Sequence, residues 1–124
     1  MAIQLQTPER LVIYVSDMAR STAFYRDTLG LPLKFTSPGW TEFNNGGTTL
    51  ALHRHMGGEV REAPPAAGQA TLVFAVDDIQ SAYEELKARG ARFSMAPQKQ
   101  ASGQTLAVLH DPDGFGITLQ QRQE

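Results

Sequence analysis

RLVIYVSDMARSTAFYRDTLGLPLKF, which covers residues 10–35, shares its pattern with a second stretch, TLVFAVDDIQSAYEELKARGARF, at residues 71–93. Each stretch opens on an apolar run, Leu11–Val15 or Leu72–Val76, of the length and composition that is typical of a buried strand. The second stretch follows the first at a nearly constant shift of about 60 residues, which indicates an internal duplication. A duplication of this period predicts two structural modules of similar topology.

A helix is expected after each of these two strands. Asp17 and Asp78 stand where an acidic residue caps the first turn of a helix. Gly30 and Gly90 stand where a helix ends on a left-handed residue. Apolar residues recur at helical spacing in the second module, and less regularly in the first. The helical positions are Ile79, Ala82, Tyr83 and Leu86 in the second module, and Ser21, Phe24, Tyr25, Thr28 and Leu29 in the first.

Three short strands are expected after each helix, separated by turns rich in Gly, Pro and Asn. The expected strands are Leu33–Thr36, Trp40–Asn44 and Thr48–His55 in the first module, and Arg92–Met95, Gln104–His110 and Phe115–Gln121 in the second. Asp111–Gly114 reads DPDG, a tight turn, and the Gly-, Pro- and Ala-rich segment Met56–Gln69 is expected to be a loop. The sequence therefore predicts an α+β fold of two βαβββ modules, at about 8–56 and 70–122, in a single domain of residues 1–124.

Composition excludes several classes of protein. The chain of 124 residues has a net charge of −2, and no basic surface points to a nucleic acid or a membrane partner. No apolar run is long enough to cross a membrane, and the N-terminus lacks a signal-peptide pattern. The absence of cysteine excludes disulfides and thiolate chemistry. A cytoplasmic protein is expected.

Three phrases carry a resemblance to a known family. They are VSDMARSTAFYRDTLGL at residues 15–31, VDDIQSAYEELKARGA at 76–91 and HDPDGFGITL at 110–119. Together they resemble the vicinal-oxygen-chelate superfamily of glyoxalases, bleomycin-resistance proteins and dioxygenases. The resemblance implies mixed sheets that curl into a glyoxalase-like cup, which holds a small molecule and, in the enzymes, one divalent metal. It also implies a homodimer.

The same resemblance implies metal ligands at four strand positions that face the cup, where the enzymes carry His or Glu. Counted from the two helix caps and the DPDG turn, these positions are Arg10, Ala51, Thr71 and Thr118. Arginine is only a donor, alanine has no ligand atom, and a neutral threonine hydroxyl is a weak ligand. No metal cofactor is therefore expected at the family position.

Two histidines, His53 and His55, lie in TLALHRHMGG, residues 49–58. Strand side chains alternate, so both histidines face the same side, about 6.6 Å apart along the strand. They form a polar pocket wall, or hydrogen-bond a ligand, or hold a displaced metal. The third alternative needs one more ligand from the set Glu42, Glu59, Glu62 and His110.

Strand alternation also predicts the lining of the cup. Arg10 pairs either with an acidic group of the ligand or with Glu9 or Glu42. The phase of the third strand stays open, since either Trp40 or Thr41 faces the cup. The predicted ligand-binding residues are Arg10, Tyr14, Trp40, Ala51, His53, His55, Thr71, Thr118 and Gln120.

Three functions are compatible with these residues. The first is a metal-free protein that binds and sequesters a small organic ligand with an acidic or oxygen-rich group, similar to the bleomycin-resistance branch. The alternative is a lyase, isomerase or dioxygenase of the same fold, with a displaced metal or with His and Tyr acid–base chemistry. The third is a regulatory module with a vestigial cup. The sequence assigns no catalytic residue.

Overall fold

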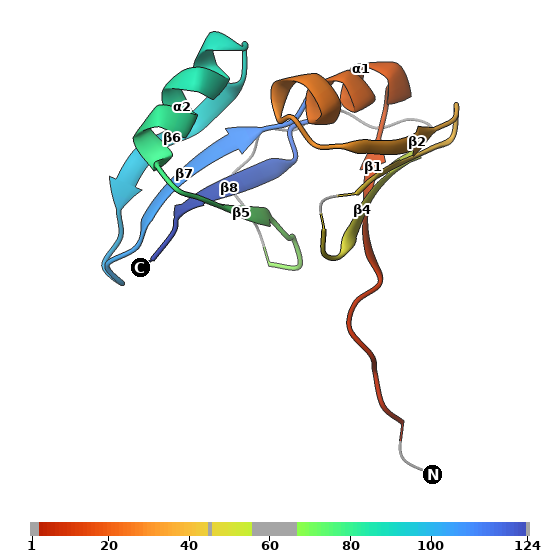
Figure 1. Ribbon diagram of the computed structural model, residues 1–124, viewed down its shortest axis with the longest axis horizontal. Helices are drawn as coiled ribbons and strands as arrows, with labels where there is room; N and C mark the ends of the chain where they lie inside the picture. The colour runs from red at the N-terminus through yellow and green to blue at the C-terminus, as the bar shows by residue number, and fades with distance from the viewer. Residues whose placement is uncertain (1–2, 45, 56–66, 124) are drawn as a thin grey trace. The chain divides into compact units, whose positions relative to one another are not determined.

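The computed structural model describes residues 3–44, 46–55 and 67–123, and the chain divides into two compact units, Met1–Gly58 and Glu59–Glu124. Of the predicted loop Met56–Gln69, residues 56–66 lie outside the described residues. The first unit contains β1 (Arg10–Val15), α1 (Met18–Ala23), the π-helix η1 (Phe24–Thr28), β2 (Leu33–Thr36), β3 (Trp40–Phe43) and β4 (Thr49–Arg54). The second contains β5 (Leu72–Val76), α2 (Ile79–Ala88), β6 (Arg92–Lys99), β7 (Thr105–His110) and β8 (Gly116–Gln121). Each unit therefore has the predicted βαβββ order (Figure 1).

Each unit builds one mixed sheet of four strands. The strand orders are β1-β4-β3-β2 and β5-β8-β7-β6. In both sheets the strand before the helix pairs in parallel with the last strand, and the other pairs are antiparallel. α1 contacts β3 and β4, and α2 contacts β6, β7 and β8 (Figure 1). Each sheet therefore has one face that its helix covers and a second, which we call the helix-free face.

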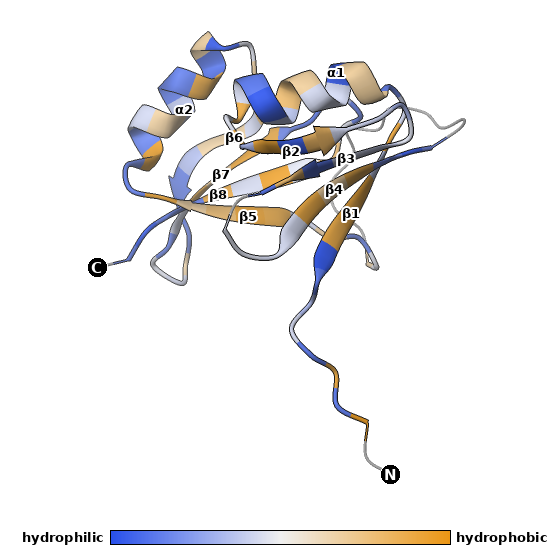
Figure 2. Ribbon diagram, turned by 45° about the vertical axis from the view of Figure 1, so that its right-hand side comes forward, coloured by the Kyte–Doolittle hydropathy of each residue, from blue (hydrophilic) through white to orange (hydrophobic). Residues whose placement is uncertain are grey.

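The helix-covered face of the first sheet carries the core of that unit. Thr41 and Phe43 on β3 are fully buried, and the Phe43 ring lies 5.9 Å from the buried ring of Tyr25 in η1. The open question of the phase of β3 is thereby answered, because Trp40 and Glu42 must face the other side. Of the outer strands that pair in parallel, β1 and β5 are apolar along most of their lengths (Figure 2).

Both predicted helix starts and ends are confirmed. The backbone N–H groups of Arg20 and Ser81 donate to the side chains of Asp17 and Asp78, at 3.0 and 3.1 Å. Gly30 and Gly90 have φ of 78° and 93°, in the left-handed region. The first helix widens into η1, where the N–H of Leu29 donates to the carbonyl of Phe24, five residues earlier. This wider turn is the physical reason for the irregular helical spacing in the first module.

Asp78 should make folding sensitive to acid. Bonds from the backbone N–H and the hydroxyl of Ser81 hold the pKa of Asp78 below its usual value. A carboxyl whose pKa is lower in the folded chain stabilises the fold at neutral pH, and this contribution disappears as the pH falls through that pKa. We expect Asp78→Asn, which keeps a capping oxygen, to lower the urea midpoint more at pH 7 than at pH 3. Glu84→Gln, on the exposed side of α2, serves as control. If Asp78→Asn lowered the urea midpoint equally at both pH values, the charge of Asp78 would not be the source of the stabilisation.

β6 is longer than predicted. The expected strand Arg92–Met95 continues to Lys99 and includes Pro97, which an edge strand tolerates because its outer N–H groups need no partner strand. β6 also contains a bulge: Phe93 lies opposite Leu109 and Met95 opposite Val108, so Ser94 is an extra residue. β2 has its own bulge between Leu33 and Phe35.

The predicted turn Asp111–Gly114 is confirmed, and Gly114 has a φ of 88°. Asp111 is fully buried, and its Oδ1 accepts hydrogen bonds from the backbone N–H groups of Asp113 and Phe115, at 2.9 and 2.8 Å. The side chain of Asp111 therefore organises the turn between β7 and β8. Of the helices in the described part of the chain, none is long and apolar enough to cross a membrane.

Candidate functional site

Four ring side chains gather on the helix-free face of the first sheet, and we call them the aromatic row: Tyr14, Trp40, His53 and His55. Tyr14 on β1 and Trp40 on β3 lie on either side of His53 on β4 in the strand register. The centroid of the His53 ring is 5.4 Å from that of Tyr14 and 5.7 Å from that of Trp40. His55, just past the end of β4, places its ring edge-on at 6.0 Å from Tyr14.

The local sequence explains why these rings emerge on one face. Ile13 and Val15 on β1 are buried against the helix-covered side, so Tyr14 between them points to the other side and is 61% exposed. Leu50 and Leu52 are buried on β4 in the same way, which turns His53 outward. Alternation on three neighbouring strands therefore produces the row.

Polar bonds orient two of the rings. The indole Nε1–H of Trp40 donates to Oε2 of Glu42 at 2.8 Å, and Glu42 also lies 3.9 Å from Nζ of Lys34. Nδ1 of His53 lies 2.8 Å from the carbonyl oxygen of Arg54, which can only accept. Nδ1 of His53 thus carries a proton, and Nε2 of the neutral ring is an acceptor for a ligand. Glu42 is the partner that sequence reasoning did not assign to Trp40, although their spacing of two residues on a strand was the available signal.

The other predicted residues of the first unit lie further from the row. Arg10 lies opposite Thr49, about 13 Å along β1 from Tyr14. Its guanidinium forms an ion pair with Glu9 at 3.2 Å, which was one of the two predicted alternatives. Ala51, opposite Val12 and Glu42, is fully buried. Ala51 therefore offers no polar group to a ligand.

The predicted residues of the second unit lie on the helix-free face of its own sheet. The hydroxyls of Thr71 and Thr118 are 3.0 Å apart, and Thr71 Oγ1 also donates to the carbonyl of Gly116 at 2.9 Å. Gln120 on β8 lies opposite Ala75 and Leu106. The two hydroxyls are thus brought together, and Gln120 lies further along the same strand.

The divalent metal that the fold family implies does not fit the residues at its four expected positions. The guanidinium of Arg10 is itself a cation and is paired with Glu9. Ala51 has no donor atom, and the hydroxyls of Thr71 and Thr118 bond to each other. Over residues 3–44, 46–55 and 67–123, no group of three or more His, Cys, Asp or Glu side chains is arranged to hold a metal ion. Glu59 and Glu62, two of the sequence candidates for a displaced site, lie outside these ranges.

The chemistry of these side chains predicts a low metal content of the purified protein. Guanidinium, methyl and hydroxyl groups bind Zn²⁺, Ni²⁺, Fe²⁺ and Mn²⁺ far more weakly than imidazole and carboxylate do. We expect the purified protein to contain much less than one equivalent of these metals by inductively coupled plasma mass spectrometry. The double variant His53→Ala/His55→Ala should contain the same amount. One equivalent of metal that this double variant loses would contradict the expectation and indicate a displaced site.

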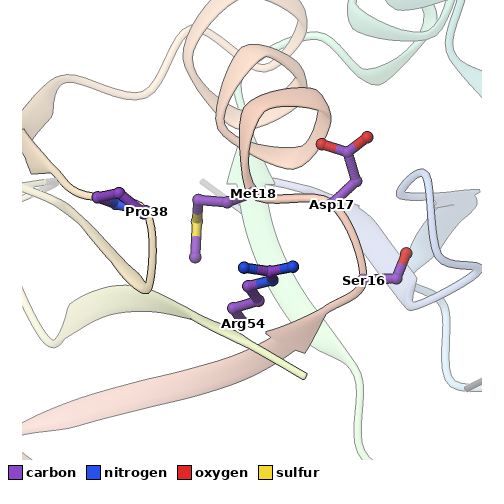
Figure 3. A pocket seen from close by; sticks show the side chains of 5 residues that line it. All are labelled: Ser16, Asp17, Met18, Pro38 and Arg54. Atoms are coloured by element: carbon purple, nitrogen blue, oxygen red, sulfur yellow. The ribbon is translucent and has the colours of Figure 1, made fainter. Parts of the chain in front are cut away.

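A pocket of about 350 Å³ lies elsewhere in the first unit, between the end of β4 and the start of α1. Ser16, Asp17, Met18, Pro38 and Arg54 line it (Figure 3). Arg54 neighbours His53 in the sequence, and alternation directs its side chain away from the aromatic row. In the second unit the last residue of β8, Gln121, holds the corresponding helix start by accepting from the N–H of Ile79 at 2.9 Å.

Comparison with known proteins places these features in a family. Residues 7–119 match the family described as the Glyoxalase/Bleomycin resistance protein/Dioxygenase superfamily. A bleomycin resistance protein of Klebsiella pneumoniae is 29% identical over 110 residues, which are 83% of each chain. A probable chloroplastic lactoylglutathione lyase of Arabidopsis thaliana is 29% identical over 122 residues, and this chain spans only 35% of its length. A crystal structure of a glyoxalase/bleomycin resistance protein/dioxygenase from Nocardioides superposes with a TM-score of 0.79 at 22% identity, over 99% of this chain and 87% of that one. Because the family match spans nearly the whole chain, the protein belongs to the Glyoxalase/Bleomycin resistance protein/Dioxygenase superfamily.

Proposed function

We propose that this protein binds a small, flat organic molecule against the aromatic row and sequesters it without breaking a bond. The observation that carries the proposal is the alignment of Tyr14, His53 and Trp40 across three strands, with ring centroids 5.4 and 5.7 Å apart. The rings of Tyr14 and Trp40 are inclined to that of His53 by 53° and 88°, so they present both apolar faces and polar edges, the kind of lining that orients an organic ligand.

The proposed contacts divide by chemistry. Aromatic faces of Tyr14 and Trp40 stack on the ligand, and Nε2 of His53 accepts a hydrogen bond from it. The phenol of Tyr14, on an exposed side chain, can donate to an oxygen-rich group of the ligand. We also propose ligand contacts within each unit by itself, by His55, Arg10 and Ala51 in the first and by Thr71, Thr118 and Gln120 in the second.

Two observations support binding over metal-dependent catalysis. The donor set at the family's metal positions lacks imidazole and carboxylate groups. The chain is also similar over 83% of its length to a protein named for bleomycin resistance, a function that sequestration can provide. Bleomycin is therefore the first ligand to test. We further propose that the protein acts in the cytoplasm as a homodimer.

The test uses Trp40, which is the only tryptophan in the chain and belongs to the aromatic row. Titration with bleomycin, and then with a panel of aromatic carboxylates such as 2-naphthoate, should change the fluorescence of Trp40 in a saturable way. We expect His53→Ala to weaken binding about tenfold, which corresponds to roughly 1.4 kcal/mol for the lost ring contact and hydrogen bond.

Arg54→Ala is the matched control, because Arg54 is also exposed and directly follows His53 but points to the opposite side of the strand. It should leave the affinity unchanged. Equal losses in the two variants, or no saturable response to any member of the panel, would contradict the proposal.

A further inference from the structure

The second unit contains a histidine and a serine in hydrogen-bond contact. Nε2 of His110, at the end of β7, lies 2.8 Å from Oγ of Ser94 on β6. Nδ1 of the same ring lies 3.1 Å from the carbonyl oxygen of Gly114. Ser94 is exposed and His110 is half-buried, so the hydroxyl can be reached from solvent while the ring is held.

These two bonds fix how the ring is protonated when it is neutral. A carbonyl oxygen only accepts, so the proton of the ring lies on Nδ1 and points at Gly114. Nε2 then has the lone pair, and the Ser94 hydroxyl donates to it. A nucleophile, a base in contact with it and a third group that orients the base make up the arrangement found in serine-based acyl transfer. Here the carbonyl of Gly114 takes the orienting role.

The turn that carries this carbonyl is itself rigidly held. The buried carboxylate of Asp111 accepts from the N–H groups of Asp113 and Phe115, on both sides of Gly114. The N–H of Gly114 donates to the carbonyl of Asp111 at 2.9 Å. His110 is therefore oriented by a fixed backbone group and not by a mobile side chain.

Comparison of the two units indicates that the fold itself does not require the serine and histidine. Ser94 is the extra residue of the β6 bulge, and Lys34 is the extra residue of the corresponding β2 bulge. Leu109 lies opposite Phe93 as Phe43 lies opposite Leu33, so Asn44 corresponds to His110. The same bulge thus forms in the first unit with Lys and Asn at these two places.

We propose that Ser94 is a nucleophile, with His110 as its general base, and that it hydrolyses small carboxylic esters, an activity beyond ligand binding. Ser94 Oγ bonds to the ester carbonyl carbon while its proton passes to Nε2 of His110. The ester C–O bond then breaks, and the alcohol leaves with that proton. Water attacks the acyl-serine, gives a proton to Nε2 and displaces Ser94, which takes the proton back as the acid is released.

The test is covalent labelling of the whole chain by diisopropyl fluorophosphate, followed by intact-protein mass spectrometry and peptide mapping. In this reaction the bond from Oγ to phosphorus forms, the P–F bond breaks, and the proton passes to Nε2 of His110. We expect one adduct, on Ser94, and none in Ser94→Ala. His110→Ala should slow labelling about 100-fold, the contribution of a positioned general base, and added imidazole should restore part of the rate.

Ser102→Ala, an exposed serine in the loop after β6, is the matched control and should label at the wild-type rate. Circular dichroism and thermal unfolding establish that each variant is folded. If His110→Ala does not fold, the absence or presence of the adduct in Ser94→Ala alone tests the proposal. Absence of an adduct in the wild-type protein, an adduct that persists in Ser94→Ala, or wild-type labelling of folded His110→Ala would each overturn the proposal.

Discussion

Replacing Asp111 with alanine should lower the free energy of unfolding by about 3 kcal/mol, because two backbone N–H groups then lose a charged acceptor. Asp111 is fully buried, and its Oδ1 lies 2.9 and 2.8 Å from the nitrogens of Asp113 and Phe115. Water cannot replace a buried acceptor without opening the turn between β7 and β8. The loss is measured by urea unfolding, monitored by circular dichroism. The dependence of the free energy on urea concentration should stay unchanged, since a changed slope would mean that the surface exposed on unfolding has changed.

Two further variants isolate the role of the Asp111 carboxylate. Asp111→Asn keeps one acceptor oxygen at the same place and should lose less stability than the alanine variant. Asp113→Ala removes the other carboxylate of this turn, which accepts neither of these two hydrogen bonds. Its loss of stability should be smaller than that of Asp111→Asn. If Asp113→Ala cost as much as Asp111→Ala, the turn would depend on its general charge and not on the buried acceptor.

Replacing Tyr14 with alanine should weaken ligand binding about 30-fold, close to the loss of roughly 2 kcal/mol that marks an aromatic hot spot. Tyr14 contacts both histidines of the aromatic row, at ring distances of 5.4 and 6.0 Å, so its removal takes away one side of the proposed platform and both of these ring contacts. Trp40 remains in this variant as the fluorescent reporter. The affinity is read from the same fluorescence titration that tests His53→Ala.

Tyr14→Phe distinguishes stacking from hydrogen bonding by the phenol. It keeps the ring and should retain most of the affinity, with a loss of about 1 kcal/mol if the hydroxyl bonds the ligand. Because Tyr14 is 61% exposed, neither change should lower the melting temperature strongly. An unchanged affinity in Tyr14→Ala would place the ligand away from the aromatic row.

Most of the fold could be predicted from the sequence, because alternation and capping are local signals. The strands that open the two modules, both caps and both closing glycines lie where the pattern placed them. The π-turn in η1 and the extension of β6 through Pro97 could not be predicted. The wider helical turn is unfavourable until packing against the sheet stabilises it, and a strand proline is tolerated only where the strand lies at the edge of the sheet.

For the candidate site, the sequence predicted only which residues lie on the same face of a strand. Alternation placed Tyr14 and His53 together, but the phase of β3 depended on the burial of Thr41 and Phe43 on the helix-covered face, which turns the half-buried Trp40 to the other face. The pairing of Ser94 with His110 gave no sequence signal at all. It depends on the register of β6 against β7, which sequence periodicity does not encode.

The parallel pairing of the first and last strands within each unit also sets the order of events on the ribosome. Arg10 pairs with Thr49, and Leu72 pairs with Ile117, so the two sheets close over about 39 and 45 residues of chain. Every strand partner of the first sheet has been synthesised once Arg54 has left the exit tunnel. The second sheet needs β8, the last strand of its unit, to complete its ladder. The first unit can thus acquire its full hydrogen-bond ladder while the second unit is still being synthesised.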